Sequence, residues 1–167
     1  EVLVEVARLM GLHPHVGAVG GLVENSEGVI VDGCCLSNEF RILESPWLGR
    51  PTSYGGPYAL ALKTQSVATT GRALAFFRIA ALKRIGAWPL PTHEISANTV
   101  MQWCARLTEH NWRVAFSPLV KARATSSFKS EKNLYNWPLS RELLLDTLWH
   151  DTDQVAALDH NVMTLEL

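Results

Sequence analysis

The spacing of hydrophobic residues changes several times along the chain, and each change predicts a different element. Residues 1–12 carry apolar side chains at helical spacing up to Gly11, which predicts a short amphipathic helix. Two valine-rich runs follow, 16–24 and 28–36. They predict two strands, joined as a hairpin or as sequential members of one sheet.

The middle of the chain is irregular before regular patterns return. Residues 37–63 are rich in glycine and proline, and a long stretch of this kind in a compact domain is often a functional lid. The β-branched run 64–71 predicts a strand that continues through 73–78. Residues 79–86 predict a short helix closed by Gly86.

The stretch NTVMQWCARLTEHNWRVAFSP gives the clearest pattern of the second half. It predicts a helix over about 99–110, capped by Asn98 or Thr99, and then a strand at 112–117. The first turn of this helix contains no carboxylate, which raises the question whether the helix has a catalytic role or only a structural one.

The remaining residues predict a polar loop at 119–138, a helix at 139–150 that begins near Ser140, and an extended tail. Helices and strands mix without strict alternation, and no internal repeat is present. The sequence therefore predicts one α/β domain, residues 1–167, with a mixed sheet and flanking helices.

Composition narrows the class of protein. With 47% hydrophobic residues in 167, the chain has enough apolar side chains for a core, and its net charge of −1 provides no general attraction for nucleic acid. The basic stretch 121–132 reads as a solvated loop. Three cysteines, two of them adjacent, favour a reducing, cytosolic compartment without disulfides. No zinc-binding spacing and no apolar run long enough to cross a membrane is present.

Five segments line up in an order that carries a resemblance: HPHVGAVGGLV (13–23), GVIVDGC (28–34), SVATTGRALAFFRIAALKRIGAW (66–88), VMQWCARLTEHNWRVAFSP (100–118) and DHNVMTL (159–165). In this order they resemble the C-terminal half of family 2 glycosyltransferases with the GT-A fold, especially the rhamnosyl-type and O-antigen enzymes. The resemblance covers nearly the whole chain and rests on the ordered set, because no single motif is decisive.

The resemblance implies a partial GT-A-like fold that lacks the N-terminal nucleotide-binding half. That half, which carries the D-x-D for metal and diphosphate, would precede Glu1. The parent enzyme would transfer a sugar from a nucleotide sugar, with Mg²⁺ or Mn²⁺, to a glycan or lipid-linked glycan. This chain would hold the acceptor side and no cofactor of its own. Its expected partners are that acceptor and the missing half, without nucleic acid or a transmembrane segment. The implied location is the cytoplasm, where the inner face of the membrane is one candidate site.

The departures from the family concern its chemistry. The catalytic acid of the family would fall on Val100 or Gln102 in one register, and on Thr99 or Met101 in the other, and none of these is a carboxylate. The metal-binding histidine of the family falls near Ala124. The resemblance to the family therefore extends to the scaffold and does not include the groups that react.

Inverting sugar transfer needs a base for the acceptor hydroxyl, so nearby groups are the candidates. Glu94 is the nearest acid and the candidate catalytic base; a solvent-facing loop glutamate is the alternative. His93 could also serve as the base and is a candidate acceptor-binding residue, with a surface histidine before a helix as its alternative. Trp88 offers a ring for sugar stacking or, alternatively, for the core. Gly71 and Arg72 would border the same acceptor surface, where Arg72 could instead form a surface ion pair.

Other features have structural explanations. The D-x-D of Asp151 and Asp153 follows the predicted helix at 139–150, whereas a nucleotide-binding D-x-D ends a strand. The GAVGG segment (17–21) lacks the Lys-Ser/Thr of a phosphate loop and predicts close backbone approach within a strand. Trp103 and Trp112 are expected to pack in the core.

Three interpretations remain open. The chain is the acceptor half of a glycosyltransferase, or a degenerate, non-catalytic GT-A-like module that binds carbohydrate or acts as a scaffold. In the third, it is an unrelated α/β domain with chance matches.

Overall fold

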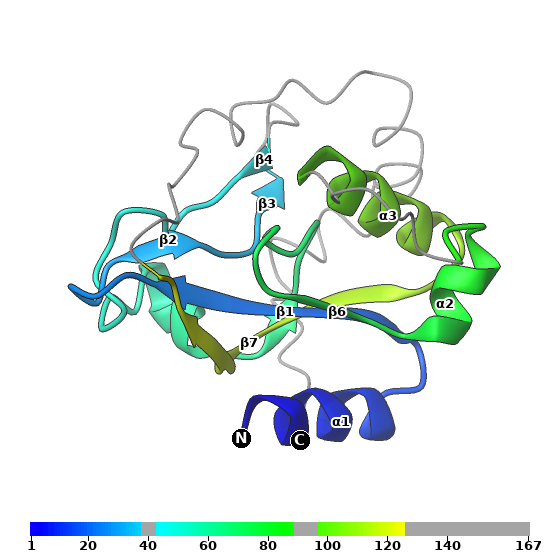
Figure 1. Cartoon of the computed structure of the whole chain (residues 1–167), viewed down its shortest axis with the longest axis horizontal. Helices are drawn as coiled ribbons and strands as arrows, with labels where there is room; N and C mark the ends of the chain where they lie inside the picture. The colour runs from blue at the N-terminus through cyan, green and yellow to red at the C-terminus, as the bar shows by residue number, and fades with distance from the viewer. Residues whose placement is uncertain (38–42, 89–96, 126–167) are drawn as a thin grey trace.

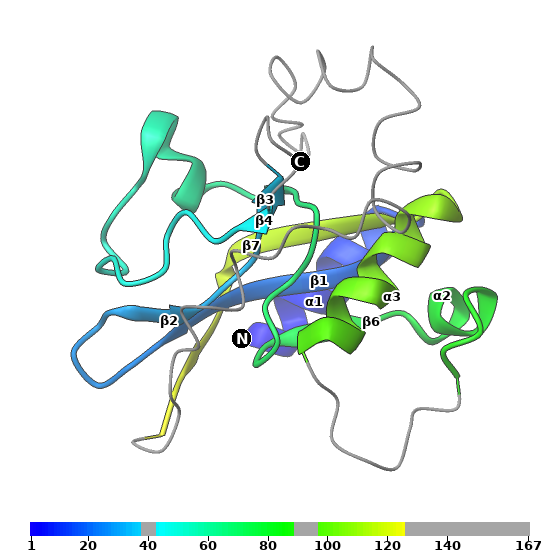
Figure 2. The same ribbon diagram turned by 90° about the horizontal axis from the view of Figure 1, so that it is seen from above.

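A computed structural model of the chain describes residues 1–37, 43–88 and 97–125. A central sheet has helix α1 on one face and helices α2 and α3 on the other (Figure 1). The view from above shows α3 lying across the sheet and α2 beside it (Figure 2). The helices and strands are, in chain order, α1 (Val2–Leu12), β1 (Val16–Glu24), β2 (Ile30–Asp32), β3 (Leu36–Ser37), β4 (Leu43–Glu44), the 3₁₀ segment η1 (Pro57–Leu62), β5 (Gln65–Ser66), β6 (Ala75–Phe77), α2 (Ile79–Arg84), α3 (Ala97–Glu109) and β7 (Arg113–Arg123).

The central strand of the sheet is β1. It pairs in parallel with β7 on one side and antiparallel with β2 and β6 on the other, while β5 adds antiparallel to β7. Strands β3 and β4 form a separate two-stranded ladder. The predicted α/β class with a mixed sheet is confirmed, and β1 and β2 pair antiparallel, which is the hairpin alternative of the two arrangements predicted for them.

Two glycines allow neighbouring segments to approach β1 closely. A Cβ on Gly21 would lie 1.7 Å from the Val120 carbonyl oxygen, and a Cβ on Gly20 would lie 2.7 Å from the Thr70 Cβ. The pairing of β1 with β7 is irregular at this point, because β7 bulges around Pro118. The close approach predicted for GAVGG is confirmed.

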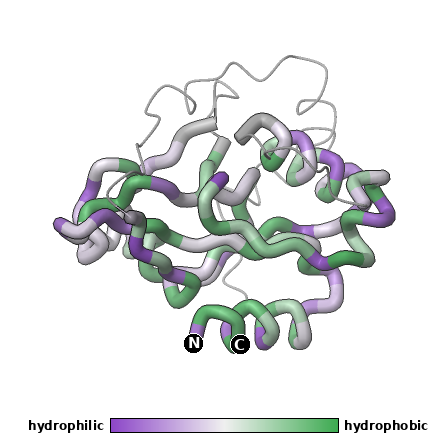
Figure 3. Tube along the Cα trace, viewed as in Figure 1, coloured by the Kyte–Doolittle hydropathy of each residue, from purple (hydrophilic) through white to green (hydrophobic). Residues whose placement is uncertain are grey.

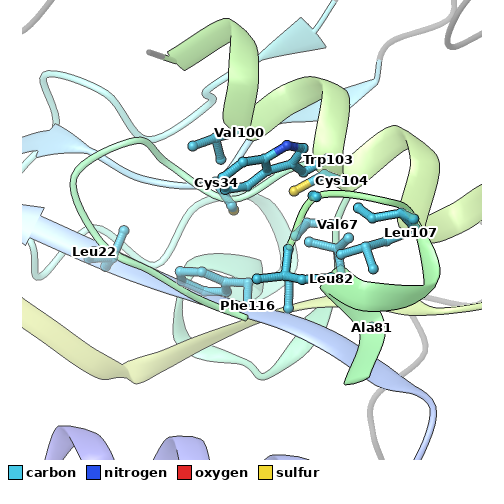
Figure 4. Close-up of a cluster of buried hydrophobic side chains, with 14 of the residues drawn as sticks. Leu22, Cys34, Val67, Ala81, Leu82, Val100, Trp103, Cys104, Leu107 and Phe116 are labelled. Carbon is cyan, nitrogen blue, oxygen red and sulfur yellow. The ribbon is translucent and has the colours of Figure 1, made fainter. Parts of the chain in front are cut away.

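Apolar side chains fill both faces of the sheet. The larger cluster lies under α3 and α2 and is shown in part in Figure 4; it includes Leu22, Ile30, Cys34, Trp47, Leu82, Val100, Trp103, Cys104, Leu107 and Phe116. The smaller cluster lies under α1 and contains Val6, Leu9, Val16, Val19, Ala115 and Val120. The predicted core positions of Trp103, which is buried, and Trp112, which is partly buried against the larger cluster, are confirmed.

Helix α1 has an unusual distribution of side chains. Glu5 is only 7% exposed and accepts hydrogen bonds from the Arg8 guanidinium at 2.7 and 2.9 Å and from the Ser117 hydroxyl at 2.9 Å. In contrast, Leu3, Val4 and Leu12 are 60–71% exposed. Hydrophobic colour therefore continues along much of the outside of this helix (Figure 3).

The structure corrects three predicted boundaries among the strands. The strand expected at 28–36 is divided into β2 and β3. The expected continuous strand through 64–78 is two strands, because β5 pairs with β7 and β6 pairs with β1. The polar loop expected from 119 onward begins later, since β7 continues past Pro118 to Arg123.

The predicted capping of α3 is also wrong. The helix begins at Ala97, so Asn98 and Thr99 lie inside its first turn and not at its N-cap. The helix itself is confirmed, with its end at Glu109. The predicted helix at 139–150 and the D-x-D at 151–153 lie outside the described residues.

Candidate functional site

The segment 68–73 runs antiparallel beside the chain that follows β2. The Cys35 amide donates a hydrogen bond to the Thr69 carbonyl oxygen at 2.9 Å, and the Ala68 amide donates to the Cys35 carbonyl oxygen at 3.1 Å. At the other end of this contact, the Ala73 amide donates to the Asp32 carboxylate at 2.6 Å. These hydrogen bonds hold both segments in one register.

Gly71 is required where these two segments cross. A Cβ at this position would lie 2.6 Å from the Gly33 carbonyl oxygen and 2.8 Å from each carboxylate oxygen of Asp32. The preceding residue, Thr70, lies against Gly20 of β1, and its hydroxyl is 4.0 Å from the Cys104 sulfur of α3. The turn that carries Gly71 and the half-buried Arg72 is therefore held between the central strand and α3.

Asp32 is the residue of this region that the sequence analysis did not select. It is 2% exposed, and the turn covers its carboxylate. A signal was available, because an acid at the end of an apolar strand must find hydrogen-bond donors when it is buried. Because the Asp32 carboxylate is buried, it fixes the turn and is not placed to contact a substrate.

Helix α3 lies beside this turn at Cys104 and provides no acid from its first turn. Its first turn contains no acidic side chain, in agreement with the sequence. Val100 and Trp103 are buried and belong to the same cluster as Cys34 and Cys104 (Figure 4). The described part of α3 therefore supports the turn mechanically.

Trp88 follows the end of α2 directly. Gly86, with a φ of +71°, ends that helix as predicted, and the hydrogen bonds Gly86 N–Lys83 O and Ala87 N–Leu82 O form a Schellman motif. Ala87 is buried, whereas Trp88 is 41% exposed. Its ring is thus partly available to solvent.

The candidate acceptor-site residues do not all lie together within the described part of the chain. Gly71 and Arg72 lie in one turn, whose preceding residue Thr70 is close to Cys104 of α3. Both views place the end of α2 apart from the start of α3 (Figures 1 and 2). Glu94 and His93 belong to the segment 89–96, which lies outside the described residues. Their predicted roles stay predictions.

Arg78 and the cysteines have structural surroundings. The Arg78 guanidinium donates hydrogen bonds to the carbonyl oxygens of Val16, at 3.0 Å, and Met10, and lies 5.9 Å from the centre of the Trp112 ring. Burial raises the pKa of all three thiols, which keeps them protonated and poorly nucleophilic; they are Cys34, Cys35 and Cys104.

The described ranges contain no group of three or more His, Cys, Asp or Glu side chains arranged to hold a metal ion. Among the helices within those ranges, none is both long and apolar enough to span a bilayer. Comparisons of the chain with models of protein families, with curated proteins and with solved structures found no match.

Proposed function

We propose that this chain forms the acceptor-binding side of a glycosyltransferase that moves a sugar from a nucleotide sugar to a glycan or lipid-linked glycan. The observation that carries the proposal is the fixed turn at Gly71 and Arg72, held between β1 and α3. A turn fixed in this way has little conformational entropy to lose when a ligand binds.

The positions of the acidic residues decide which steps this chain would perform in the proposal. Asp32 is covered by the turn, and the first turn of α3 has no carboxylate. In this proposal the described residues bind and orient the acceptor. Proton removal falls to Glu94 or to another part of the enzyme. The nucleotide sugar and its Mg²⁺ or Mn²⁺ belong to the intact parent enzyme.

Trp88 is the second element of the proposed acceptor surface. An indole ring stacks on the apolar face of a sugar, and the 41% exposure of Trp88 leaves part of the ring accessible. Arg72 supplies hydrogen bonds to hydroxyl groups. Trp88 and Arg72 would contact different sugars of one acceptor, since they lie in separate parts of the fold.

The acid-free first turn of α3 favours a second candidate function. A non-catalytic GT-A-like module would keep the same turn and bind carbohydrate, or hold other domains of a polysaccharide-assembly protein, without transferring a sugar. This candidate shares glycan binding with the first and differs from it in turnover by the intact protein.

Two assays on the chain test the binding role that both candidates share. A panel of UDP-, GDP- and dTDP-sugars, followed by released nucleotide, is expected to show no turnover by this chain alone. Glycan titration followed by tryptophan fluorescence is expected to show binding that Trp88→Ala weakens at least tenfold. Leu119→Ala, which also removes an exposed apolar side chain, is the matched control and leaves binding unchanged. Turnover abolished by a substitution inside this chain would contradict the binding-only role, and glycan binding indifferent to Trp88 and Arg72 would contradict the site.

A further inference from the structure

The loop between β4 and β5, residues 45–63, folds over a buried tryptophan. Trp47 is 1% exposed, and its ring centre lies 4.7 Å from that of Phe116 in β7. Hydrogen bonds from the Tyr54 amide to the Pro51 carbonyl oxygen and from the Ala61 amide to the Gly55 carbonyl oxygen, each 2.9 Å, close the loop internally. We call residues 45–63 the tyrosine loop, because its outer surface carries two tyrosines.

Backbone strain accompanies the more exposed of these tyrosines. Tyr58 and Ala59 have φ values of +52° and +59°. These values lie in the left-handed region, which is energetically unfavourable for residues other than glycine. Tyr58 is 90% exposed, so packing of its ring offsets little of that strain. Strained residues concentrate at functional sites, and they persist only where the surrounding structure holds them in place.

The same loop carries further groups suited to binding, and the Tyr54 ring lies next to Gly56, where an added Cβ would be 3.7 Å from the Tyr54 Cε1. The Tyr54 ring is 36% exposed and lies 5.4 Å from the Arg50 guanidinium carbon. Leu62 is 53% exposed and packs against Gly55, where an added Cβ would lie 3.4 Å from its Cδ1. The loop thus presents the aromatic rings and hydroxyl groups of two tyrosines and the guanidinium of Arg50. Gly55 and Gly56 add no side chains to the surface between them.

We propose that the tyrosine loop is a second glycan-binding site, in which the Tyr58 ring stacks on a sugar and Tyr54 and Arg50 hydrogen-bond to hydroxyl groups. A sugar ring has apolar faces and polar edges, which matches tyrosines beside an arginine. A net charge of −1 provides no general attraction for nucleic acid.

This inference rests on the proposed function, because it assigns the loop to the same class of ligand. The 3₁₀ segment η1, which carries Tyr58, lies away from α2 in both views (Figures 1 and 2). The loop would therefore contact a different part of the glycan from Trp88. An acceptor of several sugars is required to use both sites.

The test is calorimetric titration of the whole chain with four hexasaccharides: maltohexaose, cellohexaose, chitohexaose and a hyaluronan hexasaccharide. Tyr58→Gly is expected to weaken binding at least tenfold and to raise the Tm, because glycine relieves the strain. Tyr58→Phe keeps the ring and is expected to retain affinity. Ala59→Gly is the matched control: it relieves strain beside the ring, raises the Tm and leaves affinity unchanged.

The outcomes also separate this inference from the proposed function. Equal affinity in the original chain and in Tyr58→Gly, or no binding of any hexasaccharide, would overturn the tyrosine loop as a site. Loss of binding in Trp88→Ala with full binding in Tyr58→Gly would overturn the loop and retain the proposed acceptor surface. The reverse result would retain the loop and reject Trp88.

Discussion

Helix α3 packs on one face of the central sheet through apolar side chains, whereas α1 packs on the opposite face with a charged side chain buried. On α3 the buried positions include Trp103 and Leu107, and Arg106 is exposed. On α1, Glu5 is buried while Leu3 is exposed. One face is therefore held mainly by the hydrophobic effect, and the other also by a hydrogen-bonded ion pair.

The difference has a consequence for function. On the apolar face, the turn that carries Gly71 and Arg72 is held on two sides, because Thr70 lies against Gly20 of β1 and near Cys104 of α3. The α1 face depends on the ionised state of Glu5, so acid should loosen the packing of α1 on the sheet.

The largest expected effect comes from the strand that both faces share. Gly21→Ala would place a Cβ 1.7 Å from the Val120 carbonyl oxygen, so β1 and β7 would have to separate. We expect a loss of more than ~3 kcal/mol or failure to fold, measured by urea denaturation. Gly11→Ala is the control, since nothing lies within 4 Å of its Cβ position. Alanine in that helix should be neutral or stabilising by up to ~1 kcal/mol, and a loss equal to that of Gly21→Ala would contradict the geometry.

A second prediction compares leucines on the two helices. Leu107→Ala removes a side chain that is 0% exposed under α3, and should cost ~2–5 kcal/mol through lost burial and a cavity. Leu3→Ala removes one that is 70% exposed on α1, and should change stability by less than ~0.5 kcal/mol. Thermal and urea unfolding measure both. Similar losses for the two variants would mean that the outer face of α1 is covered in solution.

The pH dependence of the α1 face follows from Glu5. The hydrogen bond from Arg8, and further the one from Ser117, hold the pKa of Glu5 below its usual value of 4.5, against the opposing effect of burial. Because the folded pKa is lowered, the contribution of Glu5 to stability is complete above pH 4.5 and is lost as the pH falls through the lowered value. Glu5→Gln should cost ~1–2 kcal/mol at pH 7 and little at the acid end. Urea midpoints across this range test it; a pH-independent difference between the two proteins would refute the ionic account.

The smallest effect is expected for an exposed ion pair. Arg123 and Glu24 lie 3.1 Å apart, but the arginine side chain is 69% exposed, so water and salt screen the pair. Arg123→Ala should cost less than ~0.5 kcal/mol, measured by urea denaturation. Arg8→Ala, which removes the partner of the buried Glu5, should cost more, and the opposite ranking would contradict the role of burial.

Local patterns in the sequence predicted much of the fold. The uninterrupted valine-rich run predicted β1 to the residue, and Gly86 predicted the end of α2 because its positive φ is a local requirement. The division of 64–78 into β5 and β6 escaped prediction, because distant partners decide where each segment pairs. The extension of β7 past Pro118 likewise depends on a bulge opposite Gly21.

The candidate site was predictable only in part. Gly71 was selected from a resemblance, while its physical reason, contact with Gly33 and Asp32, needs the folded chain. Asp32 was missed although its place at the end of an apolar strand gave a signal, because the sequence does not show that the turn covers its carboxylate. The inward position of Glu5 was hidden for a related reason: a helical pattern shows which residues share a face, but not which face meets the sheet.

The measurement that tests the central claim most directly is an NMR titration of the ¹⁵N-labelled chain with a glycan hexasaccharide, which reports every amide at once. The account predicts shifts at Gly71, Arg72 and Trp88, on the side of the sheet that carries α2 and α3, and none along α1. Shifts confined to α1, or an unchanged spectrum at saturating glycan, would contradict the assignment of this chain as an acceptor-binding surface.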